Sequence, residues 1–194
     1  MLNQSDSSAI PPAIRQIATN FRWTGWISLS IQAVLGVVST GVLILASFSG
    51  RTGAASNATR AGTGFGIFFA VCGLVVLGIS IYWSFRYVRI SRQLRAPNTS
   101  LRPSKADTIQ LLQLGILLNL IGMFLTIVGA EAIVGGLIAR AIAQPQNSPL
   151  LYGTNNIPTI QPLDFFVVQA NTNTIAGHFA GLVSSFWLLH RVNR

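Results

Sequence analysis

The residues that could do chemistry are polar side chains set within two long apolar stretches in the second half of the chain. The first stretch holds one carboxylate and three amides, and the second holds a histidine and a run of amides. Such groups are costly inside a membrane, so they should face protein or water. Their oxygens suit a hard or borderline cation. The candidate cation-binding residues are Glu131, Gln169, Asn171, Asn173, Asn119 and His178.

The rise of an α-helix predicts two levels for these residues. Glu131 lies ~35 Å along its helix from Thr108, near the far membrane interface. The amide run begins one to two turns into the next stretch from that same interface, so it should lie level with Glu131. His178 lies deeper, ~21 Å from Asp164 and near the level of Asn119. We therefore expect a polar pocket that opens to the far side.

Three interpretations of this polar content are open. The groups form an ion-binding or transport path, they hydrogen-bond one another and lock the bundle, or they contact a partner. The chain has two histidines and one cysteine, Cys72, at spacings that match no zinc, haem or iron–sulfur motif. It also has no nucleophile–base pair, P-loop or dinucleotide fingerprint. We therefore expect neither an enzyme nor a cofactor, and the identity of any metal is left unknown.

The composition indicates an integral membrane protein. The chain has 194 residues, of which 51% are hydrophobic and 9% charged, whereas a soluble domain carries about 25% charged residues. So apolar a chain excludes intrinsic disorder, and a single cysteine excludes a disulfide scaffold. A soluble surface built from so few charges would leave large apolar patches.

Four apolar runs are long enough to cross a membrane. The sequence therefore predicts an all-α bundle of four transmembrane helices, which forms one membrane domain over residues 23–194. A polar N-terminus, residues 1–22, precedes it. Within that segment Pro12 to Arg22 is amphipathic, which predicts a short interfacial helix or, equally, an extension of the first span. Asp107 and Asp164 are expected to cap spans three and four. The spans cover about 24–48, 64–85, 108–139 and 165–189.

The basic residues predict the orientation in the membrane. Ten of the thirteen fall in the N-terminal segment, the middle loop and the C-terminal tail, and three fall on the other side. Because basic residues favour the cytoplasmic side, both termini should be cytoplasmic.

A run of arginines at every third position follows the second span, at Arg86, Arg89, Arg92 and Arg95. This spacing occurs in voltage-sensor helices, but the run follows a complete span and should emerge from the membrane. We expect this cytoplasmic basic loop to extend the second span and to meet anionic lipid headgroups or an acidic protein partner. Nucleic acid is not an expected partner, because the charge is divided by the topology rather than gathered on a soluble face.

Small residues recur at helical spacing in spans two to four. Such seams allow close helix approach in lipid, either within one bundle or in a homo-oligomer or partner contact. The expected packing seam is Gly115, Gly122, Gly129, Gly177 and Gly181.

Three segments resemble a known family, the four-span "permease in chloroplasts" proteins, whose plant members are also described as a Tic-associated component of the inner-envelope protein translocon. They are Phe21–Ser28, Tyr82–Ser91 and Val168–Ser184, the last with Gln-Ala-x-x-Asn-Thr followed by His-Phe-x-Gly-Leu-Val. The resemblance covers roughly residues 14–192. It implies four helices in a cyanobacterial plasma or thylakoid membrane, or the plastid inner envelope in plant relatives.

The resemblance implies competing roles in iron uptake and protein import, with assembly or quality control of photosynthetic complexes as a third. We expect a small permease-type protein that binds or transports a metal cation, and the resemblance implies that this cation is iron. The alternative is a non-transporting accessory subunit of a larger membrane complex. Membrane lipid, copies of the chain and other subunits are the expected partners.

Overall fold

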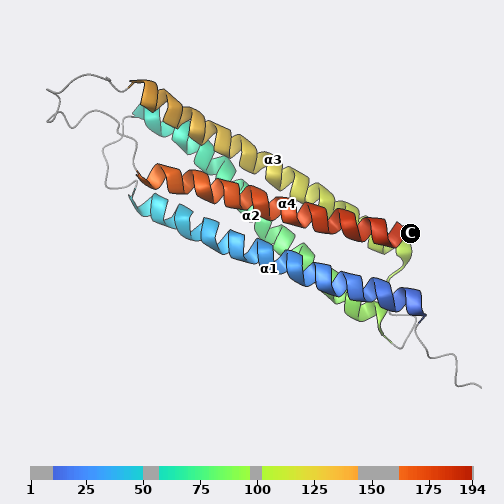
Figure 1. Ribbon diagram of the computed structural model, residues 1–194. Coiled ribbons are helices and arrows are strands. Elements are labelled where there is room, and N and C mark those ends of the chain that lie inside the picture. Colours follow the sequence, from blue (N-terminus) through green and yellow to red (C-terminus); the bar gives the residue numbers. More distant parts are fainter. Residues whose placement is uncertain (1–10, 50–56, 97–101, 144–161, 194) are drawn as a thin grey trace, which may run out of the picture.

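The computed structural model describes residues 11–49, 57–96, 102–143 and 162–193, which form four long α-helices. The helices run side by side, each antiparallel to the one before it (Figure 1). The start of α1 and the end of α4 therefore lie at one end of the bundle, together with the end of α2 and the start of α3. We call this the basic end and the opposite one the far end. The helices are α1 (Pro12–Ser49), α2 (Asn57–Leu94), α3 (Lys105–Ala143) and α4 (Pro162–Asn193).

The four helices form a closed square. Helices α1 and α3 occupy opposite corners, and each packs against both α2 and α4. Helices α2 and α4 also touch across the centre. Over the described residues the expected all-α class is confirmed. Side chains that point to the centre therefore meet neighbours from several helices at once.

Along most of its length the bundle has an apolar surface and a polar interior. Val37 and Phe124 are 73% and 65% exposed, whereas Gln32, Thr126 and His178 are completely buried. Water would not stabilise this arrangement, whereas lipid would. Within the described residues, three helical segments are long and apolar enough to cross a membrane, namely Pro12–Ala46, Gly64–Leu94 and Lys105–Ile142. Helix α4 packs between α1 and α3, which contain the first and third of these segments.

The four tryptophans lie at similar heights near the basic end. Trp23 and Trp26 flank Gly25, which packs against Val88 of α2, one to two turns from Trp83. The hydroxyl of Tyr87 lies 2.9 Å from that of Ser185, which brings Trp187 of α4 to the same region. Tryptophan is enriched at membrane interfaces, so this level is typical of a membrane boundary. Helix α2 covers about 29 Å between Gly64 and Trp83, which matches the hydrocarbon thickness of a bilayer.

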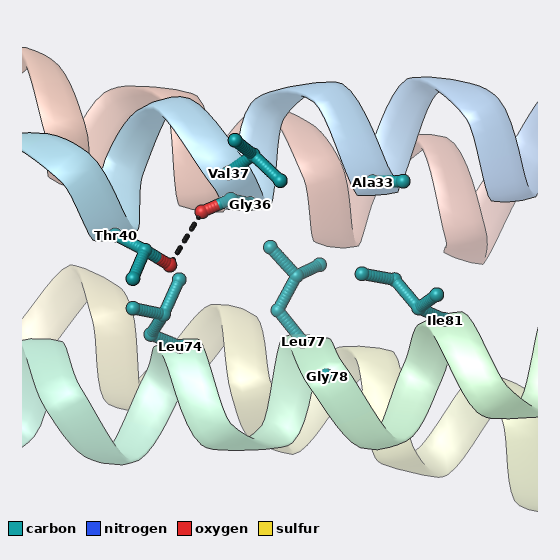
Figure 2. Close-up of a pocket in the computed structure, with 8 residues that line it drawn as sticks. All are labelled: Ala33, Gly36, Val37, Thr40, Leu74, Leu77, Gly78 and Ile81. Carbon is teal, nitrogen blue, oxygen red and sulfur yellow. Dashed lines mark hydrogen bonds between the residues drawn. The ribbon is translucent and has the colours of Figure 1, made fainter.

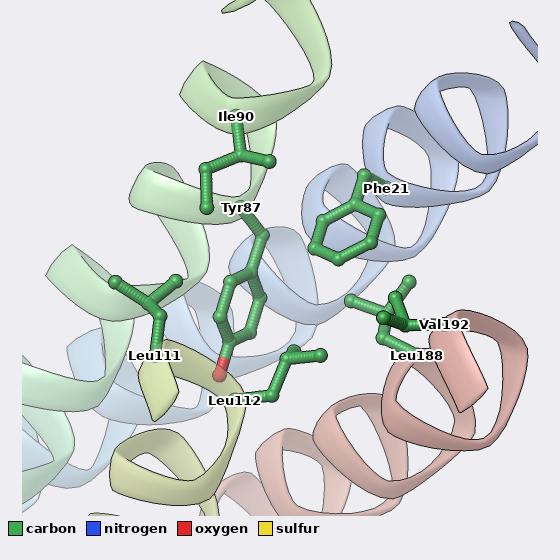
Figure 3. Packing of buried hydrophobic residues seen from close by; sticks show 7 residues of the cluster. All are labelled: Phe21, Tyr87, Ile90, Leu111, Leu112, Leu188 and Val192. Carbon is green, nitrogen blue, oxygen red and sulfur yellow. The ribbon is translucent and has the colours of Figure 1, made fainter. Parts of the chain in front are cut away.

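Beyond the tryptophans the bundle continues as a short collar with a conventional apolar core (Figure 3). The rings of Phe21 and Tyr87 meet edge to face, with centroids 6.3 Å apart. On the outside of the collar, Arg15, Arg89 and Gln110 are exposed. The collar is therefore built like a water-soluble bundle. Its core residues are Phe21, Tyr87, Ile90, Leu111, Leu112, Leu188 and Val192.

The amphipathic segment expected before the first span is not a separate interfacial helix. Helix α1 begins at Pro12 and continues without a break to Ser49. Ala18 and Phe21 are completely buried, and the carbonyl oxygen of Ala18 accepts a hydrogen bond of 2.7 Å from Ser91. The apolar face packs into the collar because α2 extends equally far to meet it. The rest of the expected N-terminal segment, residues 1–10, lies outside the described residues.

The two aspartates expected to cap helices, Asp107 and Asp164, have other roles than that of the N-cap residue. The N-cap of α3 is Ser104, whose hydroxyl accepts a hydrogen bond of 3.1 Å from the backbone of Asp107 and donates one of 2.6 Å to its carboxylate. Asp107 thus belongs to a capping pair rather than serving as the cap itself. Helix α4 begins at Pro162, a favoured first residue. Asp164 lies in its first turn and pairs with Arg140 of α3 at 3.7 Å.

Candidate functional site in the polar interior

His178 lies near the centre of the bundle and is completely buried. Its Nε2 lies 3.1 Å from the carbonyl oxygen of Gly73 on α2, and its Nδ1 lies 3.3 Å from Oδ1 of Asn119 on α3. Both oxygens can only accept, and a neutral ring has a single N–H, so it donates to one of them, and the shorter contact assigns that hydrogen bond to Nε2 and Gly73. Nδ1 then lies beside Oδ1 of Asn119 without a hydrogen bond between them. One side chain of α4 thereby contacts the neighbouring helix α3 and, across the centre, α2.

Asn119 connects this histidine to α2. Its Oδ1 accepts a hydrogen bond of 2.8 Å from the hydroxyl of Ser80, and its Nδ2 donates one of 2.8 Å to the carbonyl oxygen of Gly115. Asn119 is 2% exposed, so its amide is satisfied almost wholly by protein. The two inner residues expected from the sequence, Asn119 and His178, are therefore in contact.

Gln32 extends the network to α1. Its Nε2 donates to the hydroxyl of Ser80 over 3.1 Å, and its Oε1 accepts from Ser84 over 3.3 Å. The hydroxyls of Ser84 and Ser28 lie 3.1 Å apart. We call the six connected side chains, contributed by all four helices, the polar core. They are Ser28, Gln32, Ser80, Ser84, Asn119 and His178.

Glycines make the space that the polar core fills. A Cβ added at Gly122 would run into the ring of His178, and one at Gly181 would run into the amides of Gln32 and Asn119. A Cβ at Gly129, nearer the far end, would lie 2.8 Å from the backbone nitrogen of Ala70. Helix backbones and polar groups therefore approach as closely as glycine permits.

All five glycines of the expected seam are buried in the bundle. Gly115 faces the hydroxyl of Tyr87, and Gly177 faces Leu77. The seam thus packs helices of one chain against each other, which is one of the two roles expected for it.

The outer group expected from the sequence does not gather in the interior. Glu131 and Gln169 are exposed, and Asn173 is half-buried. Gln169 donates a hydrogen bond of 3.1 Å to Asn173 on the same helix. Asn171 is 2% exposed, and its Nδ2 has no hydrogen-bond partner within the described residues.

The outer group does not gather because its members match in height along the bundle but not in the direction of their side chains. The inner contact pairs Asn119 with His178, and antiparallel packing then places Glu131 near the level of Gln169. The two residues point away from the bundle because each is set on the outer face of its own helix. Among the described residues no group of three His, Cys, Asp or Glu side chains could hold a metal.

Four members of the polar core, Ser28, Gln32, Ser80 and Ser84, were not among the candidates from the sequence. Ser28 and Gln32 lie in the first span, which reads as a plain apolar run. A signal was present, since Gly25, Ser28, Gln32 and Ser39 recur at helical spacing on one face of α1. Ser39 also faces inward, and its hydroxyl donates a hydrogen bond of 2.8 Å to the carbonyl oxygen of Ala170 on α4.

The arginines expected in a loop lie on α2 and just beyond its end. Arg86 stacks over the ring of Trp83, with its guanidinium carbon 5.0 Å from the centroid. Arg89 and Arg92 are exposed, and Arg95 donates a hydrogen bond of 2.9 Å to the hydroxyl of Thr19 on α1. The run is thus part of the collar.

Comparison with known proteins extends the resemblance seen in the sequence motifs. A family model described as "Protein of unknown function (DUF3611)" matches residues 11–193. The chain is 39% identical over 125 residues to "Protein TIC 21, chloroplastic" from Arabidopsis thaliana. That alignment covers 62% of this chain and 41% of the relative's length. No solved structure matches the chain significantly.

Proposed function

We propose that this integral membrane protein, which belongs to the DUF3611 family, is a non-transporting, non-enzymatic subunit of a larger membrane complex. A protein-translocation complex is the leading class, because the resemblance implies a role in protein import and a relative bears the name TIC 21. A complex that assembles or maintains photosynthetic membrane proteins is the second class. A cyanobacterial plasma or thylakoid membrane is the proposed location.

The observation that carries this proposal is the mutual satisfaction of the polar core. Its amides and hydroxyls are hydrogen-bonded to one another across α1, α2 and α3, and the imidazole of α4 donates to the backbone of α2. A cation passing through would have to replace its hydration shell with groups that already take part in these hydrogen bonds. The carboxylate best suited to attract a cation, Glu131, faces outward. Such an interior holds helices together rather than conducting ions.

We also propose that α4 crosses the membrane, with both termini on the cytoplasmic side. Helix α4 is 32 residues long and packs between α1 and α3, both of which contain a candidate span. Its polar residues Asn171, Thr174 and His178 are buried, so its lower hydropathy arises from groups that do not meet lipid. The arginines cluster at the tryptophan-bearing end, which supports a cytoplasmic assignment for that end.

A permease role is the alternative, and one observation favours it. Asn171 has a buried amide nitrogen without a hydrogen-bond partner in the described part of the chain. It lies two turns of α4 from His178, on the same face of the helix. A buried amide with spare capacity is a group that a water molecule or a hydrated cation could use.

Two measurements on the whole protein separate these roles. Ferrous-iron flux is measured into liposomes that contain the purified, folded protein, and native-gel migration is measured for a tagged copy extracted from its own membrane. The proposal predicts flux no higher than in empty liposomes, and migration together with unrelated subunits. Saturable flux that falls in Asn171→Ala, with migration as a homo-oligomer, would establish the permease and overturn the proposal.

A further inference from the structure

The outer face between α1 and α2 carries an apolar groove that no residue of the polar core lines. Figure 2 shows its lining, which comes from both helices. Ala33, Gly36 and Gly78 leave room for a volume of about 220 Å³, and Leu77 and Ile81 contribute the apolar walls. The hydroxyl of Thr40 donates to the carbonyl oxygen of Gly36 over 2.7 Å. The groove therefore favours an apolar occupant.

The depth of the groove matches the hydrocarbon region of a bilayer. Along α2 it extends about 10 Å, from Leu74 to Ile81. Trp83, which lies at the membrane boundary, follows within one turn. Gly78 is exposed, and a side chain added there would meet nothing within 4 Å. The groove is thus open to lipid, and its end nearest Trp83 approaches the headgroup layer.

On both helices an arginine lies between the groove and the basic end of the bundle. Arg89 lies eleven positions after Gly78, which is close to three full turns and so keeps it on the same face of α2. Arg22 lies fourteen positions before Gly36, which is close to four turns of α1. The two arginines lie at similar heights along the bundle. Gly25, three residues after Arg22, packs against Val88, the residue before Arg89. Both are exposed, and Arg89 lies about 12 Å along the axis from Ile81.

An apolar groove in the bilayer below a pair of cations at the interface is complementary to a phospholipid with net negative charge. We propose that the α1–α2 face holds one anionic phospholipid, with its phosphate at Arg22 and Arg89 and an acyl chain in the groove. This site goes beyond the proposed function and does not depend on it. An acidic protein would find the same arginines but would have no use for the groove beneath them, so the geometry favours lipid.

The test measures lipid binding to the intact protein by native mass spectrometry in detergent. Phosphatidylglycerol and phosphatidylcholine with identical acyl chains are titrated in parallel. The first variant, Arg22→Gln with Arg89→Gln, removes the headgroup site. Its control, Lys105→Gln with Arg191→Gln, removes two charges elsewhere on the collar. The second variant, Gly78→Leu, fills the groove, and its control is Gly135→Leu, since Gly135 also meets nothing within 4 Å.

The proposal predicts one tightly bound phosphatidylglycerol with an apparent Kd at least tenfold below that of phosphatidylcholine. At about fivefold per arginine near a membrane surface, Arg22→Gln with Arg89→Gln should weaken phosphatidylglycerol about 30-fold and leave phosphatidylcholine unchanged. Gly78→Leu should reduce the bound fraction of both lipids, and both controls should match the wild type. Thermal unfolding of every variant confirms that a loss of binding reflects the site rather than the fold.

Three outcomes would overturn the proposal. The first is equal binding of the two lipids by the wild type. The second is an equal loss in Lys105→Gln with Arg191→Gln, which would indicate diffuse attraction by the collar. In the third, the arginine variant loses an acidic protein partner on native gels while its bound lipid is unchanged. That result would assign the surface to a protein.

Discussion

Removing the amide of Asn119 should destabilise the bundle more than removing any other amide of the second half of the chain. The side chain takes part in contacts with Ser80 and His178 on two other helices, and it donates to Gly115 on its own helix. Measured hydrogen bonds between membrane helices average about 0.6 kcal/mol each, with a maximum near 1.7. One interhelical hydrogen bond, the polar contact with His178 and the cavity left behind together predict about 1–3 kcal/mol for Asn119→Ala.

A matched control exists on the surface of α4. Asn173 is half-buried, and Gln169 of the same helix is the partner that donates to it. We expect Asn173→Ala to change the free energy of unfolding by less than about 0.5 kcal/mol, as for an ordinary surface substitution. Both variants remove the same chemical group, so the difference between them reports the environment.

Reversible unfolding in bicelles or mixed micelles measures both changes, with helix content followed by circular dichroism. A double-mutant cycle between Asn119→Ala and Ser80→Ala should give a coupling of about 0.6–1.7 kcal/mol. Equal destabilisation by Asn119→Ala and Asn173→Ala, together with zero coupling, would refute the hydrogen-bonded core. A large loss without coupling would instead indicate a packing effect alone.

Three further substitutions test other parts of the structure by the same unfolding measurement. Gly181→Ala should cost about 1–3 kcal/mol because its methyl would meet the polar core, whereas Gly135→Ala should be neutral or stabilising by up to about 1 kcal/mol. Equal effects would contradict the close packing. Ser104→Ala removes the N-cap of α3 and should cost about 1 kcal/mol, and no loss would argue against that helix start. Tyr87→Phe removes the hydroxyl that meets Ser185 and should cost about 0.5–1.5 kcal/mol, and an unchanged free energy of unfolding would rule out that bond.

The large-scale architecture follows from simple features of the sequence. Apolar length predicts the helices, and small residues at helical spacing predict which faces of α2, α3 and α4 turn inward. Gly115 and Gly181 are buried as that spacing indicates. The ends of the helices are harder to predict, because α1 begins at Pro12 and α2 ends at Leu94, beyond the apolar spans. These turns are stabilised by packing around Phe21 and Tyr87, which is a tertiary effect.

The candidate site is partly predictable for a similar reason. Helical rise places Asn119 and His178 at one height, and they do meet. Rise alone does not specify rotation, so Glu131 and Gln169 point outward although their height suits a pocket. Gln32 escapes prediction because one amide in an apolar run has little effect on hydropathy, yet it joins α1 to the network. A helical wheel for α1 would have placed it beside Ser28 and Ser39.

The central claim is that the polar interior is closed by hydrogen bonds within the protein. Its most direct test is the reactivity of a cysteine at the centre, Ser80→Cys, in a Cys72→Ser background. Small water-soluble thiol reagents are applied from each side of oriented membranes, with Gln93→Cys on the exposed collar as the reactive control. We expect Ser80→Cys to be unreactive from both sides of the membrane, whereas Gln93→Cys should react from one side. Rapid labelling of Ser80→Cys from either side would reveal an aqueous path and contradict the account.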